Sequence, residues 1–272
     1  MTSRPAPPPT AVDPEQQPPA DPIQQAGTPE EDWQTWPALR SLPGVAPLAC
    51  LPAPRDRPPR VLVVAAHPDD EVLGFGGTIA VLAAAGIRVR LVSVTDGEAS
   101  HPHSNTAAAR NLAAIRTREL REALARLGAA DVQSVALGMP DGKVTRHEQE
   151  LSSRLAELLR DCDLCVAPFS QDLHPDHEAA GRAALAAGAA RGVAVWEYPV
   201  WAWHWAAPGD GRLPWHRAAR LPLPFAALER KRAALACFHS QIEPLGDRPG
   251  DAAILPPAEL AYFRRDFEVI WR

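Results

Sequence analysis

Short apolar runs that alternate with longer helical stretches constrain the fold of this chain more than any other feature of its sequence. The segments between these runs repeat apolar residues at three- and four-residue spacing, as amphipathic helices do. A strand that is apolar along its length is buried on both faces, so we expect a parallel sheet with helices on each side. The runs lie at residues 61–66, 89–94, 132–137, 163–169 and 193–201.

The same pattern predicts where the helices lie. We expect them at residues 78–86, 108–128, 148–161 and 178–190, with Gly128 ending the second. After Trp201 the pattern is weaker, and we expect an edge strand at 219–223 and one helix at 225–241. The predicted fold class is α/β, a Rossmann-like three-layer fold with a mostly parallel sheet and helices on both faces.

The N-terminal segment differs in composition from the rest. Sixteen of the 30 prolines fall within residues 1–59, and up to about Asp32 the chain has almost nothing to bury. Such composition is typical of disordered or polyproline-like chain. We therefore predict a Pro-rich, disordered segment at 1–57 and a folded domain at 58–272. Trp33, Trp36 and Leu39 could dock a short piece of the segment on the domain.

Composition narrows the partners and the compartment. The net charge of −5 gives no basic field for nucleic acid or an anionic membrane. No apolar run approaches the ~18 residues of a membrane span, and no signal-peptide core precedes the domain. Cys162 and Cys165 form a single CxxC, which we interpret as two buried thiols rather than a redox or zinc pair. We predict a reducing, cytoplasmic location, and nothing in the sequence indicates the oligomeric state.

Acidic loops follow four of the predicted strands. In open α/β sheets, ligands bind beyond the carboxyl ends of the strands. All four of these loops contain acids and two contain histidine, so we expect a functional site at this edge. The loops are His67–Glu71, Asp96–Glu98, Met139–Gly142 and Ser170–His177.

Two histidines and a carboxylate in these loops have the spacing of metal ligands. His67 and Asp70 are three residues apart at one strand-to-helix turn, and His174 and His177 are three apart at another. Two histidines and one carboxylate, with a position left open, are typical of catalytic zinc. We predict that His67, Asp70 and His177 bind Zn²⁺, with Fe²⁺ or another divalent ion as the alternative.

Asp69 lies beside the predicted ligands and is free for another task. Zinc-bound water has a pKa of about 7, and a neighbouring carboxylate can take its proton. A simpler interpretation is that "HPDDE" and "HPDH" are only capped helix starts, where acids are favoured by the helix dipole. Their joint occurrence at the carboxyl ends of one predicted sheet favours the metal site.

These motifs also carry a family resemblance. "AAHPDDE" after a strand, "GG" close behind it and "HPDH" at 174–177 closely resemble the PIG-L/LmbE-like de-N-acetylases. These zinc enzymes remove acetyl groups from N-acetylglucosamine conjugates. The resemblance covers roughly residues 60–201 and resumes weakly at "KRAALACFHSQ". It implies a zinc-dependent hydrolase whose substrate is a small-molecule amino-sugar conjugate.

The resemblance also implies residue roles. His67, Asp70 and His177 match the family's zinc ligands, and Asp69 matches its general base.

His174 matches a histidine that, when protonated, steadies the oxyanion and can protonate the leaving amine, with Asp176 orienting it. Arg116 and Asp141 match residues that contact the substrate, and Arg118 competes with Arg116 for that role.

Other interpretations stay open on the sequence alone. A zinc amidase could cleave a larger amide of a thiol-sugar conjugate. A non-haem iron oxygenase uses a similar set of ligands, and a carbohydrate-binding module would need no metal. A cluster of tryptophans could form a lip of the substrate site or belong to the core. We expect two further histidines, on a polar loop, to be solvated. These residues are Trp196, Trp201, Trp203 and Trp205, and His101 and His103.

Overall fold

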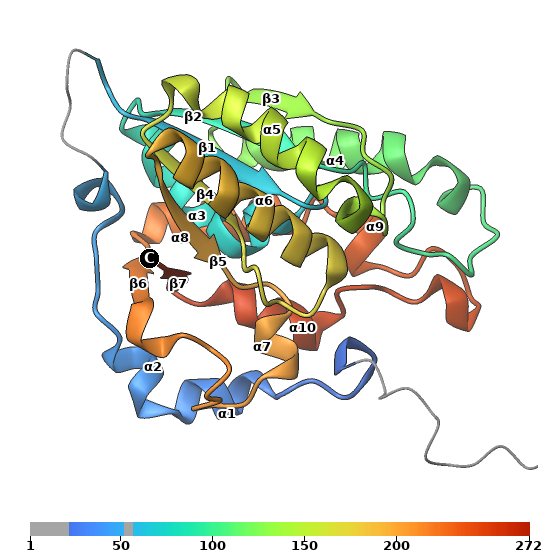
Figure 1. Cartoon of the computed structure of the whole chain (residues 1–272). Coiled ribbons are helices and arrows are strands. Elements are labelled where there is room, and N and C mark those ends of the chain that lie inside the picture. Colours follow the sequence, from blue (N-terminus) through green and yellow to red (C-terminus); the bar gives the residue numbers. More distant parts are fainter. Residues whose placement is uncertain (1–21, 52–56) are drawn as a thin grey trace, which may run out of the picture.

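The apolar runs form the strands of one seven-stranded sheet (Figure 1). The computed structural model describes residues 22–51 and 57–272. The strand order is β3-β2-β1-β4-β5-β7-β6. The strands are β1 (Arg60–Ala65), β2 (Arg88–Ser93), β3 (Gln133–Ala136), β4 (Leu164–Pro168), β5 (Ala194–Tyr198), β6 (Ala218–Pro222) and β7 (Phe267–Trp271).

Helices connect these strands. The α-helices are α1 (Glu30–Thr35), α2 (Pro37–Ser41), α3 (Asp70–Ala84), α4 (Leu112–Leu127), α5 (Glu148–Leu158), α6 (Pro175–Arg191), α7 (Ala202–Trp205), α8 (Phe225–Leu235), α9 (His239–Ile242) and α10 (Pro257–Ala261). Short 3-10 helices occupy Pro22–Gln24, Pro47–Cys50, Ala109–Asn111, Val144–His147, Leu159–Asp161, Trp215–Arg217, Pro249–Asp251 and Tyr262–Arg264. Within the described residues, no helix has both the length and the apolar character needed to cross a membrane.

The sheet is mostly parallel, which confirms the predicted fold class. Strands β1 to β5 run parallel, and β7 is antiparallel to both β5 and β6. In the central pair, Val63 of β1 lies beside Val166 of β4. The carboxyl ends of β1 and β4 are therefore neighbours. This pairing brings two loops together that are about a hundred residues apart in the sequence.

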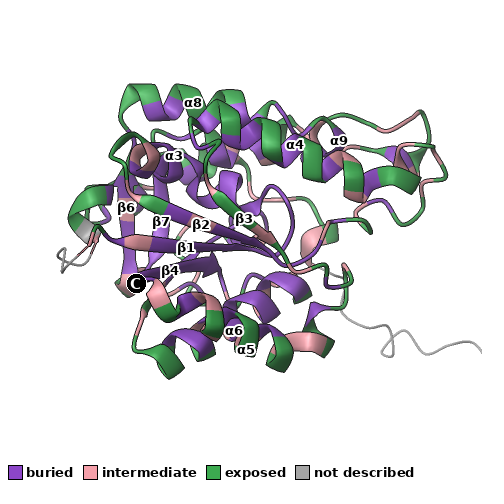
Figure 2. Cartoon of the chain, turned by 90° about the horizontal axis from the view of Figure 1, so that it is seen from above, coloured by how far each residue is buried: buried purple, intermediate pink, exposed green. Residues whose placement is uncertain are grey.

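Alternate residues of β1 feed two separate hydrophobic layers. Val61 and Val63 belong to the core beneath α3, α4 and α8, whereas Leu62 and Val64 belong to the core beneath α5 and α6. Figure 2 shows these two groups of helices on opposite sides of the sheet. The continuous apolar runs of the sequence are thus explained by burial on both faces.

Helix α3 is fixed closely against the sheet, and this fixes the turn from which it starts. A Cβ atom on Gly74 would lie 2.1 Å from the ring of Tyr198, so only glycine allows this approach. The buried Lys231 donates to the carbonyl of Leu73 and to Glu268, both at 2.7 Å. Glu268 also accepts backbone hydrogen bonds from residues 77 and 78 of α3. The ion pair is therefore satisfied on all sides, as a buried pair must be.

The C-terminal region differs from the prediction in two ways. The helix expected at 225–241 is interrupted between α8 and α9, because Glu119 of α4 accepts the N–H and hydroxyl of Ser240 at 2.8 and 2.7 Å. Strand β7 was not predicted, since a five-residue apolar run does not by itself distinguish strand from helix. It lies between β5 and β6, and β6 is the expected edge strand.

The predicted disorder of residues 1–57 is wrong for residues 22–51. Trp33 and Leu39 are buried in the main core. The indole N–H of Trp33 donates to the carbonyl of Trp203 at 2.9 Å, and the two rings pack edge to face at 5.1 Å. The partner lies 170 residues away, so composition could not reveal it. Residues 1–21 and 52–56 lie outside the described residues, and the boundary at residue 58 stays a prediction.

The single CxxC consists of two buried free thiols, as predicted. Cys162 and Cys165 are both buried and unpaired. Burial raises the pKa of Cys162 to about 11 and that of Cys165 further still. Neither thiol is therefore poised for redox chemistry or metal binding in the metal-free protein.

We expect Trp33→Ala to lower the free energy of unfolding by about 3–5 kcal/mol, because it removes a buried indole from the core. Urea denaturation of the full chain would measure the loss. Leu48→Ala is the matched control, since Leu48 in the same segment is 46% exposed and its truncation should change stability by less than about 0.5 kcal/mol. Equal stability of the two variants would show that the segment does not contribute to the core.

Candidate metal centre

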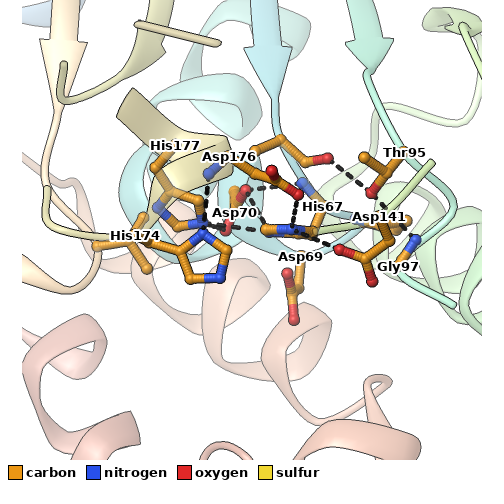
Figure 3. Close-up of polar contacts among 12 residues, drawn as sticks. His67, Asp69, Asp70, Thr95, Gly97, Asp141, His174, Asp176 and His177 are labelled. Atoms are coloured by element: carbon orange, nitrogen blue, oxygen red, sulfur yellow. Dashed lines mark hydrogen bonds and ion pairs between the residues drawn. The ribbon is translucent and has the colours of Figure 1, made fainter. Parts of the chain in front are cut away.

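Two strand-to-helix turns supply the side chains of the centre (Figure 3). The turn after β1 carries His67 and Asp70, and a side-chain oxygen of Asp70 accepts the backbone N–H of His67 at 2.8 Å. The turn after β4 carries His174 and His177, with Pro175 at the first position of α6. Proline suits that position because its fixed φ matches a helix and no N–H is lost there.

The predicted ligand atoms meet at distances that suit a tetrahedral ion. His67 Nδ1 lies 3.2 Å from His177 Nε2 and 3.6 Å from Asp70 Oδ2. His177 Nε2 lies 3.3 Å from Asp70 Oδ1. Ligands about 2.0–2.1 Å from a tetrahedral zinc ion are separated by about 3.3 Å. The three separations are therefore close to those around such an ion, with Asp70 facing His67 through Oδ2 and His177 through Oδ1.

Two other groupings of possible ligands share His67. The rings of His67, His174 and His177 offer nitrogen atoms within 4.8 Å of one another. Asp141 and Asp176 approach the opposite nitrogen, Nε2 of His67. Both oxygens of Asp176 and Oδ2 of Asp141 already accept backbone N–H groups. They are better placed to orient His67 than to bind an ion with it.

Each ligand histidine is oriented by a second carboxylate. His177 Nδ1 lies 2.8 Å from Asp172, and His67 Nε2 lies 3.1 Å from Asp141. A hydrogen bond to one ring nitrogen directs the proton there and leaves the other nitrogen free for a metal. For both rings the free nitrogen is the one that faces Asp70.

Asp172 was not singled out from the sequence. Its carboxylate is fully buried and accepts the backbone N–H groups of residues 200, 201 and 202 at 2.8–3.3 Å. These bonds connect the β4 loop to the segment after β5. Its position in the histidine-containing loop was a usable signal, but its partners become adjacent only when the chain folds.

Asp141 and Asp176 differ from their expected contacts. Asp141 holds His67 and accepts the N–H of Ala99 at 2.8 Å, so its predicted contact with the sugar stays a prediction. The carboxylate of Asp176 accepts the N–H groups of Gly142 and Val144 at 2.6 and 3.0 Å. The expected carboxylate bond to His174 is replaced by one from the backbone N–H of Asp176.

That backbone bond defines the proton position of His174. The N–H of Asp176 donates to His174 Nδ1 at 3.3 Å, so a neutral ring carries its proton on Nε2. Burial, and then the nearby rings of His177 and His67, lower the pKa of His174 to about 2. His174 is therefore a neutral hydrogen-bond donor in the metal-free protein, rather than the protonated ring that the resemblance implied.

Asp69 and Arg116 form a buried pair beside the donor atoms. Arg116 Nη2 lies 3.0 Å from Asp69 Oδ2, and the guanidinium also donates to the carbonyls of Pro68 and Gly97. Burial raises the pKa of Asp69 to about 6, although Arg116 opposes the rise. Arg118, the competing arginine, is largely exposed and pairs with Glu122. The structure thus brings Arg116, not Arg118, into the site.

The three consecutive acids have different environments. Burial disfavours ionisation of Asp70, but His177 and His67 lower its pKa well below the usual value. Glu71 is fully buried, and burial raises its pKa well above the usual value. Its oxygens have no hydrogen-bond partner among the described residues. Burial thus raises the pKa values of Asp69 and Glu71, whereas the neighbouring histidines lower that of Asp70.

A cavity of about 750 Å³ opens from this centre. The predicted site residues His67, Asp69, Asp70, Arg116, Asp141, His174 and His177 line it. Of the four clustered tryptophans, Trp201 lines the cavity, whereas Trp196 and Trp203 are buried in the core. His101, expected to be solvated, is 5% exposed and also lines the cavity. The composition of the polar loop around His101 could not show that the segment at 249–256 covers this side chain.

Comparison with known proteins shows which family the chain resembles. The structure places the predicted metal donors, two histidines and a carboxylate, at the carboxyl ends of a mostly parallel sheet. Residues 62–188 match the family model PIG-L, described as GlcNAc-PI de-N-acetylase. The match covers a little under half of the chain and agrees with the resemblance drawn from its motifs.

The curated relatives are bacterial enzymes. The 1D-myo-inositol 2-acetamido-2-deoxy-alpha-D-glucopyranoside deacetylase of Actinosynnema mirum is 35% identical over 161 residues, which cover 50% of this chain and 57% of the relative. The corresponding deacetylase 1 of Saccharopolyspora erythraea is 34% identical over 164 residues, covering 48% and 54%. The match thus spans little more than half the length of these relatives.

Solved structures show that the fold is shared. The conserved protein TT1542 of Thermus thermophilus has a TM-score of 0.50 at 29% identity, covering 67% of this chain and 79% of that one. The zinc-inhibited form of teicoplanin deacetylase Orf2 has a TM-score of 0.59 at 19% identity, covering 78% and 97%.

We expect the affinity of the metal-free protein for Zn²⁺ to rise with pH. Burial opposes protonation of His177, but Asp70 and Asp172 raise its pKa to about 9, so metal binding must displace a proton below that pH. Each displaced proton should raise the affinity about tenfold per pH unit. Competition with a chelator at pH 6.5, 7.5 and 8.5 would measure this, and a constant affinity would contradict it.

The same pKa shift affects the stability of the metal-free fold. The stabilisation that protonated His177 provides should be complete below pH 6.5 and lost as the pH rises through 9.

We expect Asp172→Asn to weaken zinc binding about 10- to 100-fold, because it removes the anion that orients and polarises His177. Calorimetric titration of the metal-free variant would measure the change. Asp161→Asn is a control at a carboxylate that precedes β4 and pairs with arginines near the amino-terminal ends of β1 and β2, away from the centre. If both variants bind zinc like the wild type, Asp172 has no role in the centre.

Proposed function

We propose that this protein is a metal-dependent hydrolase that removes the N-acetyl group from an N-acetylglucosamine-type conjugate. The observation that carries the proposal is the position of Asp69. A carboxylate with a pKa near 6 shares one cavity with a donor set that fits a divalent ion. The match to the PIG-L family model and the names of the curated relatives support the same chemistry.

His67, Asp70 and His177 would hold the ion, with zinc as the expected metal and Fe²⁺ or another divalent ion as the alternative. When bound, such an ion lowers the pKa of water and polarises a carbonyl oxygen. The donor distances and the two orienting carboxylates support this assignment.

Asp69 is the proposed general base. With a pKa near 6 it is mostly ionised at pH 7, yet basic enough to accept a proton from water. Arg116 holds its carboxylate through the 3.0 Å ion pair. Arg116 is therefore proposed to position the base, and its predicted contact with the substrate comes second. Gly97 makes room for this arginine, because a Cβ atom there would lie 2.2 Å from Arg116 Nη1.

His174 is the proposed donor to the oxygen that becomes negative when the amide is attacked. Its proton is on Nε2, and its Nδ1 is held by the backbone of Asp176. A neutral donor that is already oriented needs no reorganisation as charge develops. The proton that Asp69 takes from water can then pass to the leaving amine, so that His174 keeps its own proton and stays neutral. Asp176 contributes by fixing the 142–144 loop and, through its N–H, the ring.

The rival functions differ in their requirements. An iron oxygenase would use the same two histidines and one carboxylate, but it has no use for the general base Asp69. An amidase for a larger amide would need room beyond the metal end, which the cavity provides. A carbohydrate-binding module would not need the donor set. The cytoplasmic location expected from the sequence stays a prediction.

Acetate release from acetylated amino-sugar conjugates tests the proposal. Metal-free full-length protein should be inactive, and addition of Zn²⁺ should restore acetate release with equal yield of the free amine. Fe²⁺ under anaerobic conditions should also support hydrolysis. Turnover that requires oxygen, or sugar binding that is indifferent to chelator with no acetate released, would contradict the proposal.

We expect Asp69→Asn to lower kcat about 10²- to 10⁴-fold while zinc stays bound, because the variant keeps the shape of the side chain but cannot accept the proton. Steady-state kinetics together with metal analysis would measure both quantities. Turnover like that of the wild type would refute the base assignment.

We expect His174→Ala to lower kcat about 10²- to 10³-fold, as loss of one oxyanion donor does, without loss of zinc. His177→Ala is the matched comparison, since it should lose the metal. Equal metal loss in the two variants would show that His174 is a ligand instead of a donor.

A further inference from the structure

The residues that line the cavity fall into two groups. The predicted metal donors, Asp69 and Arg116 form a polar group. The rest of the lining, which we call the outer cavity, contains apolar side chains from three separate segments of the chain. These are Ile23 from the N-terminal segment, Val200 and Trp201 after β5, and Ile254, Leu255 and Pro256 before α10. A cavity of about 750 Å³ is in the upper half of the ~300–1,000 Å³ typical of small-molecule sites, so it has room beyond one amino sugar.

The buried polar side chains of the outer cavity are already paired within the protein. Both ring nitrogens of His204 are engaged, with Glu259 at 2.8 Å and the carbonyl of Gln25 at 3.0 Å. Both ring nitrogens of His101 are engaged as well, with Ser100 and with the carbonyl of Ala252. A hydroxyl-rich group placed here would lose water without gaining these partners, which costs free energy. An apolar group would not incur that cost.

The N-terminal segment is fixed where it reaches the outer cavity. Thr28 donates its N–H to the carbonyl of His204 at 2.8 Å and its hydroxyl to the carbonyl of Ala206 at 2.6 Å. A Cβ atom on Gly27 would lie 2.4 Å from His204 Nδ1, so glycine is needed for the close approach. Glu30 pairs with Arg265, and Trp33 is buried in the core. Ile23 is thus held at the cavity by contacts on its C-terminal side.

The apolar residues of the outer cavity lie outside the part of the chain that the family model matches. The family match covers residues 62–188, whereas Ile23, Trp201 and Ile254 lie before or after it. The residues of the metal centre lie within it. The polar group therefore belongs to the shared chemistry, and the apolar residues of the outer cavity come from the flanking parts of this chain.

We propose that the outer cavity binds an apolar group attached to the amino sugar, and that Ile23 of the N-terminal segment selects for it. This inference rests on the proposed deacetylase function, because it concerns the substrate of the same site. The substrate class is an N-acetylglucosamine glycoside whose aglycone presents an alkyl or aromatic face to Ile23, Trp201 and Ile254.

Matched glycosides test the inference. Methyl and hexyl glycosides of N-acetylglucosamine, of the same anomeric configuration, share the reacting amide and differ only in apolar length. The zinc-loaded full chain should have a KM at least about tenfold lower for the hexyl glycoside, because extra buried methylenes add affinity. Ile23→Ser should reduce that preference about 3- to 10-fold through KM. Leu48→Ser is the matched control, since it makes the same kind of change at an exposed position of the same segment and should keep the preference.

Two outcomes would overturn the inference. One is equal KM values for the two glycosides in the wild type. The other is a preference that is unchanged in both Ile23→Ser and Gly27→Val, the second of which should displace the segment from His204. Failure of the deacetylase proposal is a separate result, seen as no acetate from either glycoside.

Calorimetric binding of hexyl and methyl glucosaminide then decides the inference without turnover. Tighter binding of the hexyl compound that weakens in Ile23→Ser supports the outer site, and equal binding excludes it.

Discussion

The structure depends on the convergence of two imidazoles and one carboxylate from turns on adjacent parallel strands. His67 and His177 present ring nitrogens to each other at 3.2 Å, with Asp70 beside both. Without a metal, burial opposes protonation of both rings, but the surrounding carboxylates raise their pKa values. A divalent ion would replace those protons and reverse the local electrostatics. The pairing of β1 with β4 makes this convergence possible.

The surrounding loops are held by acids that accept backbone N–H groups. Asp172 binds three N–H groups of the segment after β5, and Asp176 binds two of the loop after β3. Each acid therefore has two effects. It orients a histidine or the residues around one, and it joins a second loop to the centre. Such connections keep the donor atoms in place before substrate binds, as preorganised sites require.

The flanking segments give the centre its surroundings. Residues before the region that the family model matches supply Ile23 and the buried Trp33, and residues after it supply Trp201 and the 249–256 loop. These segments contact one another at His204, which bonds both Glu259 and the carbonyl of Gln25. The lining of the cavity therefore depends on contacts between distant parts of the chain. The residues proposed for the chemistry thus come from closely spaced motifs. The residues proposed for substrate selectivity come from segments that are far apart in the sequence.

Local sequence patterns predicted every strand of the sheet except β7, most helices and the candidate residues of the centre, because periodicity and turn spacing act over a few positions. They placed His67, Asp70 and His177 in neighbouring loops, but they did not give the distances between the side-chain atoms of these residues. Only the tertiary structure decided that Asp172 orients His177 and that Asp141 holds His67. It also decided that α8 and α9 are separate and that Trp33 belongs to the core. Each of these depends on a partner far away in the sequence, and no local propensity records which distant groups will meet when a hydrophobic core forms.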